Sequence, residues 1–147
     1  MTEISKSIEI ESSPEKVFAL MLDVKKVSEF TNGKEKVEIT SKGRLQVGAT
    51  WHMTSKSAGL KTETDMEVTE FEKNKKMVSH STGGSRVDMK TWWILEPTAK
   101  GTKVTHGGDY KVPYSVLGKI LDKLMIKRNM ENTTEEILEE MKKTLEP

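Results

Sequence analysis

The chain has 147 residues, no cysteine, 32% charged residues and a formal net charge of +1. This length predicts one domain, residues 1–147, with a core that needs no disulfide or metal. The balanced charge argues against nucleic-acid binding. Because no apolar run reaches the ~20 residues of a membrane span and the N-terminus lacks a signal-peptide pattern, we expect a soluble cytoplasmic protein.

The N-terminal stretch predicts a strand followed by two short helices. Residues 4–11 alternate between apolar and charged side chains, as in a half-buried strand. Ser13 and Pro14 then suit the N-cap and first turn of a helix, and Asp23 suits the cap of a second. A turn at residues 31–33 ends this helical part.

From residue 36 to residue 110 the pattern predicts six further strands joined by short turns, which favour antiparallel pairing. The clearest alternation places Met66 and Val68 on the inner face. Trp92 and Ile94 fall either on an outer face or at a bulge, and the sequence leaves both possibilities open.

The C-terminal segment, from about residue 113 to residue 145, shows the longest helical periodicity. Its apolar positions form two groups, Leu117/Ile120/Leu121/Leu124/Met125 and Ile137/Leu138/Met141/Leu145. At 100° per residue these groups are turned by roughly 100° from each other. We expect one half of the helix to face a cavity and the other to pack on the sheet; a helix that simply follows a curved core is the alternative.

These elements predict an α+β fold in which a seven-stranded curved antiparallel sheet wraps around the long C-terminal helix. Two short helices lie between the first and second strands. Because a sheet with one apolar face needs a cover, the helix is expected on the concave side. One helix does not fill that side, so an internal cavity is expected between sheet and helix.

Four stretches resemble the START/polyketide cyclase-like (SRPBCC, helix-grip) superfamily: SSPEKVF at 12–18, VGA at 47–49, LEPTAKGTKVT at 95–105 and YKVPYSVLGKIL at 110–121. The resemblance spans essentially the whole chain and implies the helix-grip fold. It also implies a pocket for lipids, sterols, quinones, plant hormones or polyketides, in which some members catalyse cyclisation or dehydration. Fold alone does not choose among these.

We expect the ligand to contact apolar side chains and a few polar ones that orient it. The candidate ligand-binding residues are Trp51, Met53, Met66, Val68, His80, Met89, Trp93, His106, Tyr110, Leu117, Leu121, Met125 and Arg128. Arg128 would bind a ligand carboxylate or phosphate, or else pair with an acid such as Glu131. For the Trp and Met residues, plain core packing is the competing interpretation.

The sequence assigns no catalytic residue, no metal site and no cofactor. Its three histidines lack metal-pair spacing, and His52 is expected to face solvent. A buried His80 or His106 would suit a general base, or would simply be bonded to a neighbour. Gly107-Gly108 either form a bulge that turns both His106 and Asp109 inward, or let the strand bend.

Three functions follow from this interpretation. The first, which we favour, is binding or transport of a hydrophobic or amphipathic small molecule (lipid, quinone or polyketide-like) by a non-enzymatic monomer or weak dimer. The second is a cyclase/dehydratase-type enzyme that uses the same cavity. The third is a partner-binding module of the chaperone-activator type, whose contact surface would be the outer face around Trp92 and Ile94.

Overall fold

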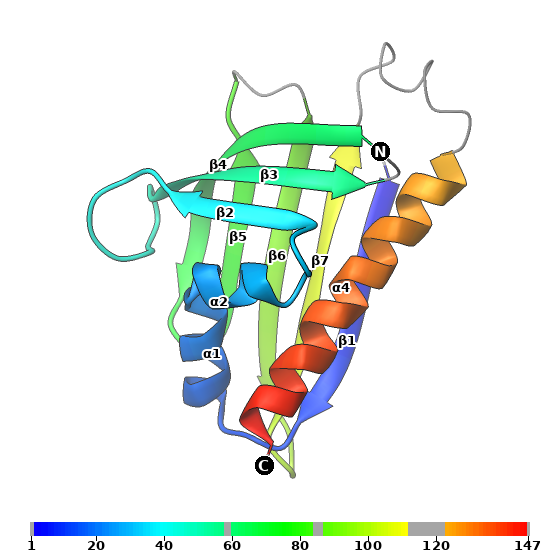
Figure 1. Ribbon diagram of the computed structural model, residues 1–147. Coiled ribbons are helices and arrows are strands. Elements are labelled where there is room, and N and C mark those ends of the chain that lie inside the picture. Colours follow the sequence, from blue (N-terminus) through cyan, green and yellow to red (C-terminus); the bar gives the residue numbers. More distant parts are fainter. Residues whose placement is uncertain (1, 58–59, 84–86, 112–122, 147) are drawn as a thin grey trace.

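The computed structural model describes residues 2–57, 60–83, 87–111 and 123–146 (Figure 1). The elements are β1 (Thr2–Ile10), α1 (Pro14–Leu22), α2 (Val24–Glu29), β2 (Glu35–Ile39), β3 (Thr50–Ser57), β4 (Leu60–Glu72), β5 (Lys76–Ser81), β6 (Asp88–Pro97), β7 (Thr102–Lys111) and α4 (Lys123–Leu145). This order confirms the predicted one. The start of the predicted long helix, with Leu117 and Leu121, lies outside the described residues.

The seven strands form one sheet in the order β1-β7-β6-β5-β4-β3-β2, and neighbouring strands are antiparallel. Apart from the β1–β7 pair, all neighbours are consecutive in sequence. The sheet bends around one side of α4, as Figure 1 shows. A register shift between Val68 and Glu70 of β4 contributes to this bend, because a bulge increases local twist.

The strand pairing settles the two questions that the sequence left open about bulges. The register passes through Gly107 and Gly108 without a shift, so no bulge forms there and Asp109 does not join His106 on the inner face. A Cβ built on Gly107 would instead collide with the Ile4 carbonyl oxygen of β1. Trp92 pairs regularly with Gly107, which places its side chain on the outer face.

The predicted helix caps are present. The Ser13 hydroxyl accepts a hydrogen bond from the Lys16 amide at 3.3 Å, and Pro14 is the first residue of α1. The Asp23 carboxylate accepts from the Lys26 amide at 3.2 Å and caps α2. These bonds satisfy amides that have no partner inside the helix.

The C-terminal helix α4 lies alongside β1 and crosses the concave face of the sheet (Figure 1). Its last turns bury Ile137, Leu138 and Met141 against the inner faces of α1 and the central strands. Lys6 of β1 forms ion pairs with α4, as does Lys34, which precedes β2. Ion pairs therefore hold the helix near both edges of the curved sheet.

Candidate functional site

A cavity of about 160 Å³ lies between the concave face of the sheet and α4. Its wall combines residues of all seven strands with others from α1, α2 and α4, so it belongs to the tertiary arrangement rather than to one segment. Most of the lining side chains are aliphatic, thioether or aromatic. Its polar members are Glu35, Ser55, Thr62, Thr91, His106, Tyr110 and Thr134. Such a wall suits an apolar ligand held by a few polar contacts.

Six of the thirteen predicted ligand-binding residues line this cavity. They are Trp51, Met53, Met89, Trp93, His106 and Tyr110. All lie on strands β3, β6 and β7, at positions that alternate toward the helix. Met66 and Val68 share the inner face but are fully buried in the core and do not line the cavity. Their surfaces are already covered by neighbouring side chains.

His80 lies on the outer face of the sheet, contrary to the inward position considered from the sequence. It pairs across the sheet with Glu67 and Lys90, which are both exposed. Its ring Nδ1 lies 2.8 Å from the Thr69 hydroxyl. A residue whose cross-strand partners are solvated shares their face, so His80 is not a cavity residue.

Met125 and Arg128 are also exposed rather than lining the cavity. The helix phase explains this result, because Ile137 is held in the core. At 100° per residue Ile126 lies within about 20° of Ile137, whereas Arg128 points to roughly the opposite side. Ile126 therefore takes the inward position, and Met125 remains 49% exposed.

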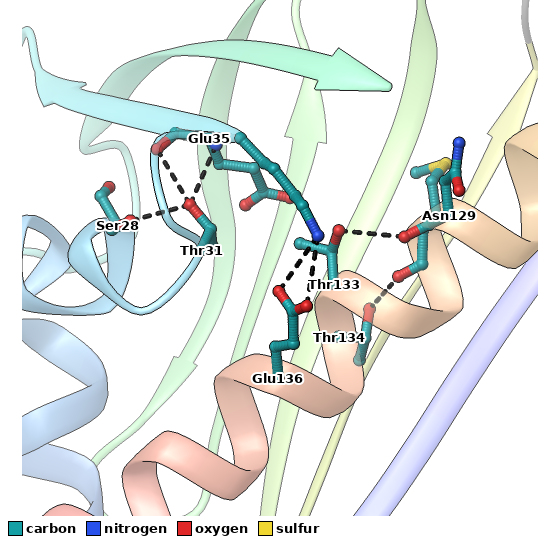
Figure 2. A network of polar contacts seen from close by, with 9 residues as sticks. Ser28, Thr31, Glu35, Asn129, Thr133, Thr134 and Glu136 are labelled. Atoms are coloured by element: carbon teal, nitrogen blue, oxygen red, sulfur yellow. Dashed lines mark hydrogen bonds and ion pairs between the residues drawn. The ribbon is translucent and has the colours of Figure 1, made fainter. Parts of the chain in front are cut away.

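The cavity stripe of α4 continues through a stretch that is polar in sequence. Ile126, Met130, Thr134 and Ile137 line the cavity. The Thr134 hydroxyl donates to the Met130 carbonyl at 2.9 Å, and Thr133 makes the same contact with Asn129 (Figure 2). Because each hydroxyl is bonded to the preceding turn of its own helix, threonine is tolerated on an inward face.

His106 is the histidine that faces the cavity. Its ring stacks on Trp93 with centroids 3.7 Å apart and planes inclined by 13°. Nδ1 lies 2.9 Å from the Trp92 carbonyl oxygen, so the neutral ring carries its proton on Nδ1 and donates there. Burial lowers the pKa of His106 to about 4, against a weaker opposing effect of the carbonyl. The ring is therefore neutral near pH 7, with Nε2 as an acceptor.

Glu35, which sequence reasoning did not single out, supplies the carboxyl group of the described cavity wall. Burial raises its pKa to about 7. Glu35 opens β2, where its amide donates to the Thr31 hydroxyl at 3.0 Å (Figure 2). The alternation of Glu35, Val37 and Ile39 was the one sequence signal for its inward direction.

Tyr110 adds a third ionisable group to the same wall. Burial raises the pKa of its phenol, partly offset by a hydrogen bond with the Thr2 side chain. The phenol therefore stays protonated at neutral pH and serves as a hydrogen-bond donor or acceptor. An acid, a neutral imidazole and a phenol thus share one largely apolar cavity.

The outer face of the sheet and His52 lie outside the cavity. Trp92 and Ile94 are both half-buried, so neither forms a strongly exposed apolar patch. His52 lies 2.8 Å from Asp65, whose hydrogen bond raises the pKa of the imidazole.

Within the described ranges, no group of three or more His, Asp or Glu side chains is arranged to hold a metal ion. The described helices are too short or too polar to span a bilayer.

A family of known proteins matches this chain over almost its whole length. Residues 1–146 match the family model described as polyketide cyclase/dehydrase and lipid transport. No curated protein matches the sequence.

Solved structures share the fold at low sequence identity. TTHA0849 from Thermus thermophilus is 19% identical, with a TM-score of 0.76 over 95% of this chain and 97% of its own. DR_A0006 from Deinococcus radiodurans is 17% identical, with a TM-score of 0.71 over 99% and 100%. The Aha1 dimer from Colwellia psychrerythraea is 19% identical, with a TM-score of 0.66 over 99% and 97%. These likenesses concern the fold alone.

Proposed function

The chain belongs to the polyketide cyclase/dehydrase and lipid transport family, and from this premise we propose that it binds or carries a small hydrophobic or amphipathic molecule as a monomer or weak dimer. The largely apolar cavity of about 160 Å³ between sheet and α4 carries the proposal. An engineered apolar cavity of ~150 Å³ binds benzene, so this volume suits a ring or a short chain of a lipid, quinone or polyketide-like molecule. Burial of apolar ligand surface, at roughly 25 cal/mol per Å², would drive affinity.

Native mass spectrometry of protein purified from cells tests this proposal together with a pair of tryptophan variants. Val37 lines the cavity from β2, whereas the neighbouring Glu38 is exposed on the other side of the same strand. Val37→Trp should fill the cavity and abolish retention of a small molecule, and Glu38→Trp should leave it unchanged. Retention of no molecule by the wild type, or equal retention by Val37→Trp, would refute the proposal.

Enzymatic cyclisation or dehydration is a second candidate, favoured by His106 and Glu35 in one wall. The Glu35 carboxyl, with a pKa of about 7, suits proton transfer at neutral pH, and His106 stays in the neutral form that can accept a proton. The assay is deuterium incorporation into a bound ketone in heavy water. Exchange that follows a bell-shaped pH profile and is lost in His106→Ala supports this function. Exchange that persists in this variant argues against it.

The partner-binding alternative has weaker support from the described residues. It required an exposed apolar patch around Trp92 and a filled interior. Trp92 and Ile94 are half-buried, and the interior contains a cavity. The fold that this chain shares with the Aha1 dimer therefore supplies an analogy of architecture alone.

A further inference from the structure

The described part of the cavity wall contains an acidic side chain and no cationic one. Among the described residues that line the cavity, Glu35 is the one with a carboxyl group, and none is a lysine or an arginine. His106 is neutral near pH 7 because burial lowers its pKa, and the phenol of Tyr110 stays protonated. An acidic group therefore faces the cavity without a cationic side chain beside it in this part of the wall.

Neither of the two lysines adjacent to Glu35 in the sequence neutralises it. Lys36 is exposed and, as the next residue of the same strand, points to the other face of the sheet. Lys34 turns away from the cavity and places its ammonium 3.2 Å from both carboxylate oxygens of Glu136 on α4. The contacts drawn for Glu35 in Figure 2 are made by its backbone, with the Thr31 hydroxyl. Within the described ranges its carboxyl group has no hydrogen bond or ion pair, so its oxygens are available to a ligand.

The other polar and aromatic groups of the wall favour the same kind of ligand. With its proton on Nδ1 and directed to the Trp92 carbonyl, His106 offers Nε2 as an acceptor. Trp51 also lines the cavity, and the face of an indole ring attracts cations. The described wall is thus rich in groups that accept hydrogen bonds or attract positive charge.

We propose that the cavity selects a small apolar molecule that carries one protonated amine, and that the Glu35 carboxylate pairs with this ammonium group. This inference rests on the proposed function, because it names the class of molecule that the cavity binds. A molecule with a carboxylate in place of the amine would bring two like charges together in an apolar wall, without a described lysine or arginine to compensate.

Three matched probes test the inference by calorimetry: 2-phenylethylamine, 2-phenylethanol and phenylacetate. Each has one ring, in keeping with a cavity of about 160 Å³. At pH 8 the amine should bind about tenfold or more tightly than the alcohol, because its hydrogen bond to the carboxylate is charged. Phenylacetate should bind most weakly. Since the pKa of Glu35 is about 7, the amine affinity should fall about tenfold from pH 8 to pH 6.

Glu35→Gln keeps the size of the side chain and removes its charge, and Glu38→Gln removes a charge from the exposed side of the same strand. Glu35→Gln should bind amine and alcohol equally, with no pH dependence, and Glu38→Gln should behave as the wild type. Equal affinities in the wild type, or an amine preference that survives in Glu35→Gln, would overturn the inference and leave the proposed function intact. Failure of all three probes to bind would overturn both.

Discussion

Glu35 and His106 should give the folded protein two opposite pH dependences of stability that nearly cancel. The pKa of Glu35 is about 7 against an ordinary 4.5, so the folded state retains a proton that the unfolded chain releases. Stability is therefore lost as pH rises from 4.5 to 7. At ~1.4 kcal/mol per pH unit the loss is about 3 kcal/mol.

His106 acts in the opposite direction over almost the same range. Its pKa is about 4 in the folded protein against an ordinary 6.5, so the unfolded chain binds a proton that the folded state does not. Its contribution is complete above pH 6.5 and is lost as pH falls to 4, again about 3 kcal/mol. Between pH 4.5 and 6.5 the two slopes have opposite signs, and the wild type should show little change from this pair.

Urea unfolding of three variants between pH 4 and pH 8 separates the two contributions. Glu35→Gln should become more stable by about 3 kcal/mol as pH rises from 4 to 6.5, because the His106 slope then stands alone. His106→Gln should lose about 3 kcal/mol from pH 4.5 to 7. The double variant should show neither of these two slopes, and Glu38→Gln should follow the wild type. The slope is the readout, since His106→Gln also removes the stacking on Trp93.

A wild-type pH profile in Glu35→Gln would refute this prediction, because it would mean that Glu35 ionises in the folded protein as it does in the unfolded chain. NMR titration gives an independent check on His106. Its ring should remain neutral, with the proton on Nδ1, until the pH approaches 4. His52 should instead ionise at higher pH than an ordinary histidine, because Asp65 stabilises its charged form.

Three further predictions concern the scaffold and are tested by chemical denaturation. Met141→Ala should lower the free energy of unfolding by about 2–5 kcal/mol, because Met141 is fully buried. The control Met125→Ala, at a site 49% exposed, should change it by less than about 0.5 kcal/mol. Equal losses in the two variants would contradict the packing of α4. Gly107→Ala should cost about 1–3 kcal/mol or more through collision with the β1 backbone, and Gly83→Ala, with open space around it, should cost less; a neutral Gly107→Ala would refute the close β1–β7 approach. Ser13→Ala should lose about 1 kcal/mol with the cap of α1, and an unchanged stability would show that the cap is dispensable.

Local sequence patterns were sufficient to predict the elements of this protein and their order. Alternation in β4 identified the inner face on which Met66 and Val68 lie. Ser13 and Pro14 marked the start of α1, because capping and proline geometry act within one turn. The succession of one strand, two helices, six strands and a final helix then predicted the sheet that bends around α4.

The cavity wall depends on contacts between distant segments, and there the predictions were less complete. The register of β5 against β4 and β6 turned His80 outward, and packing of Ile137 in the core set the helix phase that exposes Arg128. Glu35 was overlooked because a glutamate at the start of an edge strand is ordinarily solvated.

What the sequence determined by itself is therefore the set of residues that share a face within each element, since that follows from the periods of strand and helix. The tertiary structure alone decided which of these faces enclose the cavity and which polar groups of the described residues line it. Sheet curvature and helix phase arise from packing between residues far apart in the chain. The same packing brings Glu35, His106 and Tyr110 into one cavity and gives its groups their altered pKa values.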